Sequence, residues 1–274
     1  MLISVGRFVL SVEGKAVSEL SLPDSWQKYI SAGQAPEGAV AIRLEENAFL
    51  RGNRFRDGWE VYDGSEGKSA VYSDHGKAVF SLRYNEPEKM TIVSVGGHGS
   101  GSLRLGLQYG MMLALHRECI GLHGVTLLCG NEVVILSAPS GTGKTTLAAL
   151  LGKYGDAAAV NGDFALLSPT ADGVIFEPTP FCGSSGRNLN HRLRVDRVVF
   201  LSQAKGNTWR GLNGREAIKE FMDNCFIPTW DREMQKAIQT NVVNCIGSVR
   251  VNAYAFAPTQ EAADLFMRVT KTRE

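Results

Sequence analysis

The stretch from Ser137 to Leu151 constrains the fold of this chain more than any other. It reads SAPSGTGKTTLAALL, and an apolar run at residues 133–136 precedes it. Leucines at positions 147, 150 and 151 have the spacing of one helix face. A strand, a small-residue loop ending in Gly-Lys-Thr and a helix, in that order, form the phosphate-binding P-loop pattern. We therefore predict a strand over 133–136 and a helix over 144–154, with a nucleotide bound between them.

Each part of this loop has a physical task. Glycines allow the backbone to curl so that successive N–H groups face an anion, and the helix N-terminus adds partial positive charge. We expect Lys144 to reach the β- and γ-phosphates of ATP and the Thr145 hydroxyl to bind Mg²⁺. Ala138 replaces the usual first glycine, which is tolerated where φ stays negative. The alternative is a glycine-rich turn with a chance lysine. The predicted nucleotide-binding residues are Ser140, Gly141, Thr142, Gly143, Lys144, Thr145 and Thr146.

Composition and charge limit the class of protein. The chain has 274 residues, of which 44% are hydrophobic and 21% charged, and its formal net charge is +1. This balance is typical of a soluble globular protein with one large or two small domains. It argues against nucleic acid as a partner, because no basic field is implied. No apolar run reaches the length of about 18 residues that predicts a membrane span.

The cysteines indicate the redox compartment. The chain has 5 of them, an odd number, and no pair has Cys-x-x-Cys spacing. This argues against a zinc site and against a disulfide framework. The first apolar run is broken by Arg7 and lacks a basic segment, so no signal peptide is predicted. A cytoplasmic location is the expectation.

The chain divides into segments that differ in their pattern of apolar and turn residues. Residues 1–100 carry short apolar or alternating runs between turn residues, which predicts an N-terminal β-rich domain with a small antiparallel sheet. Residues 101–119 form a predicted connecting helix. Residues 120–274 mix strands with helices, which predicts an α/β or α+β core. The predicted strands are residues 5–12, 40–44, 59–62, 70–72, 78–84, 90–95, 122–128, 133–136, 158–160, 164–167, 174–176, 197–201 and 248–256, and the predicted helices are 26–32, 103–117, 144–154, 215–224, 231–241 and 259–271.

Asp163 is the candidate catalytic acid. Phosphoryl transfer needs a carboxylate that holds Mg²⁺ or accepts the proton of the attacking hydroxyl. Asp163 ends the small apolar run 157–160 after Asn-Gly, and we expect this run to form a strand beside the P-loop strand. The alternative is an ordinary turn aspartate. An acid so soon after the P-loop favours a compact kinase. Because Asn-Lys-x-Asp is absent from the sequence, a GTPase is excluded, which leaves a kinase or an ATPase.

Two further residues are candidates whose roles the residues alone leave open. His123 stands in Leu-His-Gly, before the P-loop strand, and is either a neighbour of the γ-phosphate or a half-buried structural histidine. Arg187 lies in the polar loop 178–188 and either stabilises transferring charge or is a solvated loop residue. The apolar link 226–231 is interpreted as packing, with a substrate lid as the alternative.

The motifs Leu122-His123-Gly124, Pro-Ser-Gly-Thr-Gly-Lys-Thr at 139–145 and Asn161-Gly162-Asp163 together resemble the HPr serine kinase catalytic domain and its relatives, which include lasso peptide kinases. The resemblance is good over about residues 120–270 and weak over the first hundred residues. It implies an HPr-kinase-like core, self-association, and ATP- and Mg²⁺-dependent phosphorylation of a serine hydroxyl. It also implies that Lys144 and Thr145 bind phosphate and metal, that Asp163 is the base or a metal ligand, and that His123 is the active-site histidine.

The chain departs from the family's pattern at two places. Gly162 stands where the first of two adjacent acids is usual, so both acid roles fall on Asp163. The Glu-x-Arg-Gly motif that accompanies the phosphorylase reaction of HPr kinases is absent from the sequence. The resemblance therefore implies a relative rather than an HPr kinase itself.

These observations predict a kinase that transfers the γ-phosphate of ATP to a hydroxyl, with a serine of a peptide or protein as the favoured acceptor. The alternatives are a kinase of free serine or a small hydroxy acid, and a nucleotide-binding regulatory protein with weak or no transfer. A closed pocket lined by residues 179–188 would favour a small acceptor, and an open groove beside the P-loop would favour a peptide. The predicted catalytic residues are Asp163, His123, Lys144 and Arg187, and the predicted metal ligands are Thr145 and Asp163.

Overall fold

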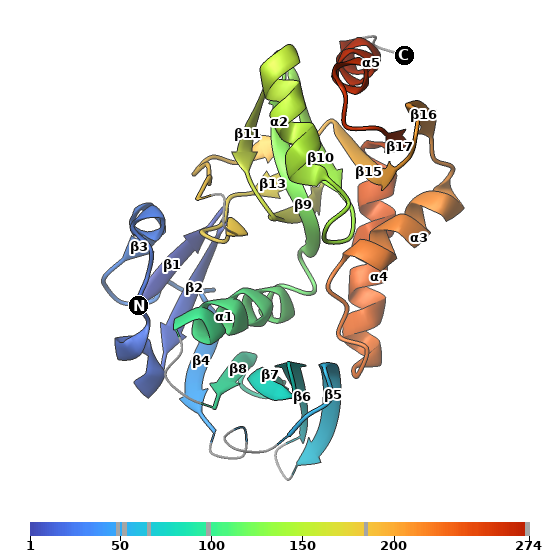
Figure 1. Cartoon of the computed structure of the whole chain (residues 1–274). Coiled ribbons are helices and arrows are strands. Elements are labelled where there is room, and N and C mark those ends of the chain that lie inside the picture. The colour runs from blue at the N-terminus through green and yellow to red at the C-terminus, as the bar shows by residue number, and fades with distance from the viewer. Residues whose placement is uncertain (48–49, 51–53, 65–66, 97–99, 184–185, 272–274) are drawn as a thin grey trace. The chain divides into compact units, whose positions relative to one another are not determined.

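The computed structural model describes residues 1–47, 50, 54–64, 67–96, 100–183 and 186–271 (Figure 1). The chain divides into two compact units. Unit 1 comprises Met1–His116 and Pro228–Gln235, and unit 2 comprises Arg117–Ile227 and Lys236–Glu274. Both units contain a β-sheet with helices packed on it, so the chain has the mixed α/β composition that the sequence predicts. Within the described ranges, no helix is both long and apolar enough to cross a membrane.

Unit 1 is built on an eight-stranded sheet in the order β3-β1-β2-β4-β8-β7-β6-β5. Helix α1 (Ser100–Ala114) packs across β4, β7 and β8 (Figure 1). Gly110 permits this close approach, because a Cβ there would lie 2.5 Å from Cγ2 of Val93. The other elements are β1 (Leu2–Val5), β2 (Phe8–Glu13), η1 (Lys15–Glu19), η2 (Asp24–Tyr29), β3 (Ile30–Ser31), β4 (Val40–Glu46), β5 (Gly58–Gly64), β6 (Gly67–Asp74), β7 (Lys77–Asn85) and β8 (Met90–Val95).

Three expectations for this unit are wrong in detail. The sheet is mixed rather than antiparallel, since β2 pairs with β4 and β4 with β8 in parallel. Turn residues reveal hairpins but not pairings between distant strands, so parallel pairs leave no local signal. The run 5–12 is a hairpin, in which the chain reverses at Gly6 (φ 57°) and Val5 pairs with Phe8. The helix predicted over 26–32 is the 3₁₀ helix η2 followed by β3.

An aromatic cluster includes a residue from the second segment of unit 1. The rings of Trp59 and Trp230 lie 5.3 Å apart between centroids, and Trp59 also contacts Phe80 and Tyr109 at 5.6 and 5.5 Å. Such contacts are those of packed aromatic side chains. The packing interpretation of the link 226–231 is therefore confirmed for Trp230.

Unit 2 contains a nine-stranded sheet in the order β14-β13-β12-β9-β10-β15-β17-β16, and β11 pairs with β9. Strands β10, β15 and β17 are mutually parallel, whereas β9 runs antiparallel to β10 and β12. The strands are β9 (Ile120–Cys129), β10 (Glu132–Ser137), β11 (Ala157–Asn161), β12 (Phe164–Thr170), β13 (Gly173–Glu177), β14 (Leu193–Arg194), β15 (Arg197–Gln203), β16 (Thr208–Gly211) and β17 (Arg250–Phe256), and the helices are α2 (Lys144–Tyr154), α3 (Gly214–Asn224), α4 (Arg232–Ile246) and α5 (Gln260–Lys271). The start of α4, residues 232–235, belongs to unit 1.

Helices cover both faces of this sheet. On one face, Phe221 of α3 and Val242 of α4 join a buried cluster with Leu122 and Ile135. On the other face, Leu147 of α2 joins a buried cluster with Leu127 and Leu136 of β9 and β10, and Phe266 of α5 packs against Tyr254 of β17. This three-layer arrangement follows from strands that are apolar on both faces.

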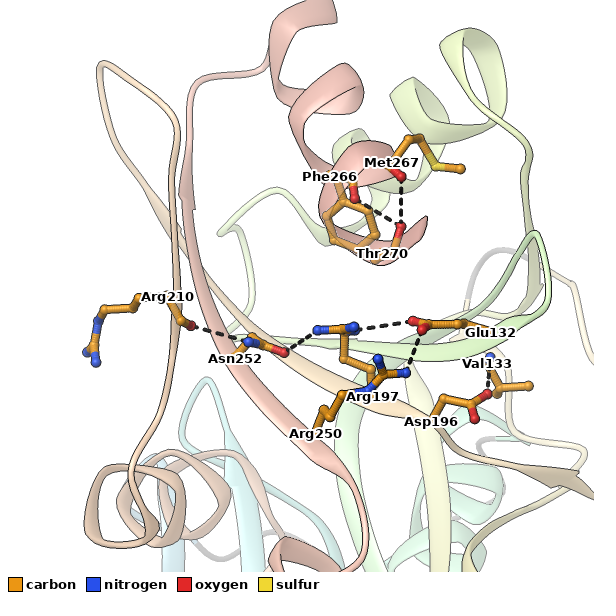
Figure 2. A network of polar contacts seen from close by, with 10 residues as sticks. All are labelled: Glu132, Val133, Asp196, Arg197, Arg210, Arg250, Asn252, Phe266, Met267 and Thr270. Carbon is orange, nitrogen blue, oxygen red and sulfur yellow. Dashed lines mark hydrogen bonds and ion pairs between the residues drawn. The ribbon is translucent and has the colours of Figure 1, made fainter. Parts of the chain in front are cut away.

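A partly buried ion network joins the amino ends of the three parallel strands (Figure 2). Glu132, the first residue of β10, accepts from Arg197 Nε at 3.2 Å and pairs with Arg250 on β17. Arg197 also donates to Asn252 Oδ1 at 2.8 Å. The network connects the amino ends of these strands. The P-loop sequence lies at the other edge of the sheet, where β10 ends.

Candidate active site

The loop 138–143 joins the carboxyl end of β10 to the start of α2, so the predicted strand, loop and helix are all present. Gly141 and Gly143 have φ angles of 79° and 101°, in the left-handed region that favours glycine. Ala138 is not among the residues with positive φ, which explains why alanine is accommodated there. Thr142 Oγ1 donates to the Pro139 carbonyl at 2.9 Å and tightens the loop.

Lys144 lies at the junction of the loop and α2, and it is buried. Its Nζ donates to the carbonyl oxygens of Ala138 at 2.7 Å and Pro139 at 3.1 Å, so the ammonium is held inside the loop. Burial lowers the pKa of Lys144, and the nearby Asp163 carboxylate opposes this shift. The ammonium of Lys144 and the carboxylate of Asp163 are therefore close enough to interact electrostatically.

His123 and Asp163 come together through strand register. His123 of β9 pairs with Phe164 of β12, the residue after Asp163. The Gly124 N–H donates to the Asp163 carbonyl at 3.1 Å, and His123 Nδ1 lies 3.6 Å from Asp163 Oδ1. Burial lowers the pKa of His123, the Lys144 ammonium lowers it further, and Asp163 opposes both. Three of the four predicted catalytic residues thus lie within mutual electrostatic reach.

The strand before Asp163 does not lie beside the P-loop strand, which corrects that expectation. β9 separates them, because β11 and β12 pair with successive halves of β9. Asp163 stands at the break between these two strands and has a φ of 82°. A left-handed non-glycine residue costs about 1 kcal/mol or more and is enriched at functional sites.

Gly183 packs directly against Asp163, a contact that we did not predict. A Cβ on Gly183 would lie 2.7 Å from the Asp163 Cβ, and the φ of Gly183 is 56°. The loop 178–188 therefore approaches the candidate acid, although Ser184 and Ser185 lie outside the described residues. A glycine inside a polar loop is the sequence signal that would have pointed to this contact.

Arg187 lines a groove of about 790 Å³ together with Thr145 and Gly162. The remaining groove residues come chiefly from α2 and β11. The structure thus places Arg187 in the same groove as Thr145, the first predicted metal ligand.

Gln203 is a further loop contact that we did not predict. It ends β15, and its Nε2 donates to the Gly141 carbonyl at 3.2 Å. The carboxyl ends of neighbouring parallel strands converge at one edge of a sheet, a rule that would have pointed to this residue.

The side chains predicted to hold Mg²⁺ are of the right chemical type. The hydroxyl of Thr145 and the carboxylate of Asp163 are oxygen donors, both residues are exposed, and Mg²⁺ is commonly held by one or two such ligands together with phosphates. Among the described residues, no group of three or more His, Cys, Asp and Glu side chains is arranged to hold a metal.

No protein-family model matches the chain, and no curated protein matches its sequence. Among solved structures, the chain is similar to the Hpr(Ser) kinase/phosphatase from Coxiella burnetii, with a TM-score of 0.34 and 11% identity over 55% of this chain and 88% of that one. This is the family that the motifs resemble, but a TM-score of 0.34 is too low to carry an argument about activity.

Proposed function

We propose that the protein is an ATP- and Mg²⁺-dependent kinase that transfers the γ-phosphate to a hydroxyl, with a serine of a peptide or protein as the acceptor. The observation that carries this proposal is geometric. The Lys144 ammonium is held by the carbonyl of Ala138 in the loop 138–143, and His123 Nδ1 lies 3.6 Å from Asp163 Oδ1. A cation beside a glycine loop and a nearby carboxylate are the parts that phosphoryl transfer requires.

Each residue has a distinct role in the proposed reaction. The loop and Lys144 bind the phosphates, and Lys144 exchanges its carbonyl contacts for phosphate oxygens. Asp163 accepts the proton of the attacking hydroxyl, and His123 beside it orients the carboxylate. Bound through Thr145 and Asp163, Mg²⁺ would neutralise phosphate charge.

The groove supports a peptide or protein over a small acceptor. It lies beside the P-loop helix and is lined by α2 and β11, while the loop 179–188 contributes Arg187. A pocket enclosed by that loop would have favoured free serine or a hydroxy acid.

A nucleotide-binding regulatory role is the second candidate, and Gly162 favours it. Because Gly162 stands in place of a second acid, both proton transfer and metal binding depend on Asp163. Such a protein would bind MgATP and transfer phosphate slowly or not at all.

Calorimetry with MgATP tests the proposal first. The wild-type chain should bind, and Lys144→Ala should abolish tight binding, whereas Lys153→Ala on the exposed part of the same helix should bind normally. Mass spectrometry of phosphate transfer from labelled ATP to peptides and to free serine then separates the candidates. Unchanged MgATP affinity in Lys144→Ala would exclude the site, and binding without transfer would support the regulatory role.

A further inference from the structure

The groove beside the P-loop helix runs along two turns of α2. Its α2 wall is formed by Thr145, Ala148, Ala149 and Gly152, which is one helix face over two turns. At a rise of 1.5 Å per residue this wall is about 10 Å long. Residues 157–159 of β11, all alanine, form another wall. Such a length accommodates about three residues of an extended chain, at about 3.3 Å each.

β11 is an edge strand along this groove. It pairs with β9 on one side, and among the described residues its other side is paired only at Asn161, which bridges Asn188. Ala158 is exposed. An unpaired strand edge presents backbone N–H and C=O groups that an added strand satisfies, which is a recurring mode of peptide recognition.

This edge leads directly to the candidate acid. β11 ends at Asn161, and Gly162 and Asp163 follow. A chain paired along 157–160 is therefore directed toward Asp163. Arg187 lines the groove with Gly162 and Thr145, and its guanidinium is complementary to a carboxylate.

We propose that the acceptor binds as an extended peptide strand added to the edge of β11. Small alternate side chains enter the groove, the acceptor serine reaches Asp163, and an acidic residue near that serine contacts Arg187. This inference rests on the proposed function and adds the conformation and sequence class of the acceptor. In the reaction, the serine Oγ forms a bond to the γ-phosphorus, its proton passes to Asp163, and the bond to the bridging oxygen of ADP breaks.

A positional-scanning library of ten-residue peptides with one fixed serine and labelled ATP provides the first test. We expect Asp or Glu to be favoured at least fivefold at one position within three residues of the serine. Gly, Ala or Ser should be favoured over bulky residues at alternate positions. A flat profile, or transfer to free serine but to no peptide, would overturn the inference.

Backbone methylation of the peptide tests strand addition without altering the protein. N-methylation of alternate residues should lower kcat/KM at least tenfold at one alternating set of positions and little at the other, because only one set donates to β11. Equal tolerance at both sets would contradict strand addition.

Variants of the protein test the groove and its charge. Arg187→Glu should change the preferred residue from acidic to basic, whereas Arg194→Glu on β14 should leave the preference unchanged. Ala149→Phe should raise the KM for peptide at least fivefold with the KM for ATP unchanged. Lys153→Phe is the control, because Lys153 lies on α2 but does not line the groove. A raised KM for ATP instead would show that the groove binds the nucleotide. Because MgATP calorimetry uses no peptide, failure here is distinguishable from failure of the proposed kinase.

Discussion

His123 of β9 lies beside Asp163, the residue that immediately precedes β12, with Nδ1 and Oδ1 3.6 Å apart. This separation is longer than a hydrogen bond, so the pair is an electrostatic contact. The carboxylate side chain remains 55% exposed and accessible to an acceptor.

Replacing Asp163 by Asn should remove activity and preserve the fold. Asparagine tolerates the left-handed φ of 82° that Asp163 adopts, so the melting temperature should change little. Loss of the proton acceptor should lower kcat roughly 10²- to 10⁴-fold. Steady-state kinetics and thermal unfolding measure both effects. A kcat within twofold of the wild type would exclude Asp163 as the base.

Gly183→Ala should reduce activity beyond what backbone strain explains. Gly183 and Gly186 have similar φ angles of 56° and 63°, so alanine at either should cost about 1 kcal/mol of stability. At Gly183 alone the new Cβ would lie 2.7 Å from Asp163, while at Gly186 no described atom lies within 4 Å. Gly186→Ala should therefore retain kcat and Gly183→Ala should lose at least tenfold. Equal kcat in both variants would contradict this role of Gly183.

Glu132→Ala should destabilise unit 2 strongly. The Arg197 side chain is 5% exposed, so removing its partner leaves a buried charge unpaired (Figure 2). Breaking a buried pair in this way costs about 3 kcal/mol. Urea unfolding measures the change, and Asp223→Ala, which breaks the exposed pair with Lys219, is the control expected to have little effect. Similar unfolding midpoints for the two variants would contradict a stabilising role for the network.

Thiol reagents should label the folded protein slowly. Burial raises the pKa of Cys129 and of Cys245 to about 12, so at pH 8 both are protonated and thiols react as thiolates. Labelling followed by mass spectrometry should show both residues protected in buffer and reactive in urea. Rapid modification of Cys129 in the folded protein would show that this end of β9 opens readily.

The sequence determines the elements that depend on local pattern. The strand at 132–137 and the helix beginning at Lys144 follow from an apolar run, glycines and leucine spacing that act within a few residues. The strand at 90–95 is likewise predicted with its observed bounds. The loop conformation follows as well, because positive φ at Gly141 and Gly143 is what glycine provides locally.

Only the tertiary structure decided how these elements meet. The contact between His123 and Asp163 depends on the register of β9 with β12, and β11 shares β9 with β12 instead of lying beside β10. Register and strand order arise from packing and hydrogen bonds between residues far apart in sequence, which no local pattern specifies. The same reason explains why the parallel pairs of unit 1, the approach of Gly183 to Asp163 and the groove along β11 emerged from the folded chain alone.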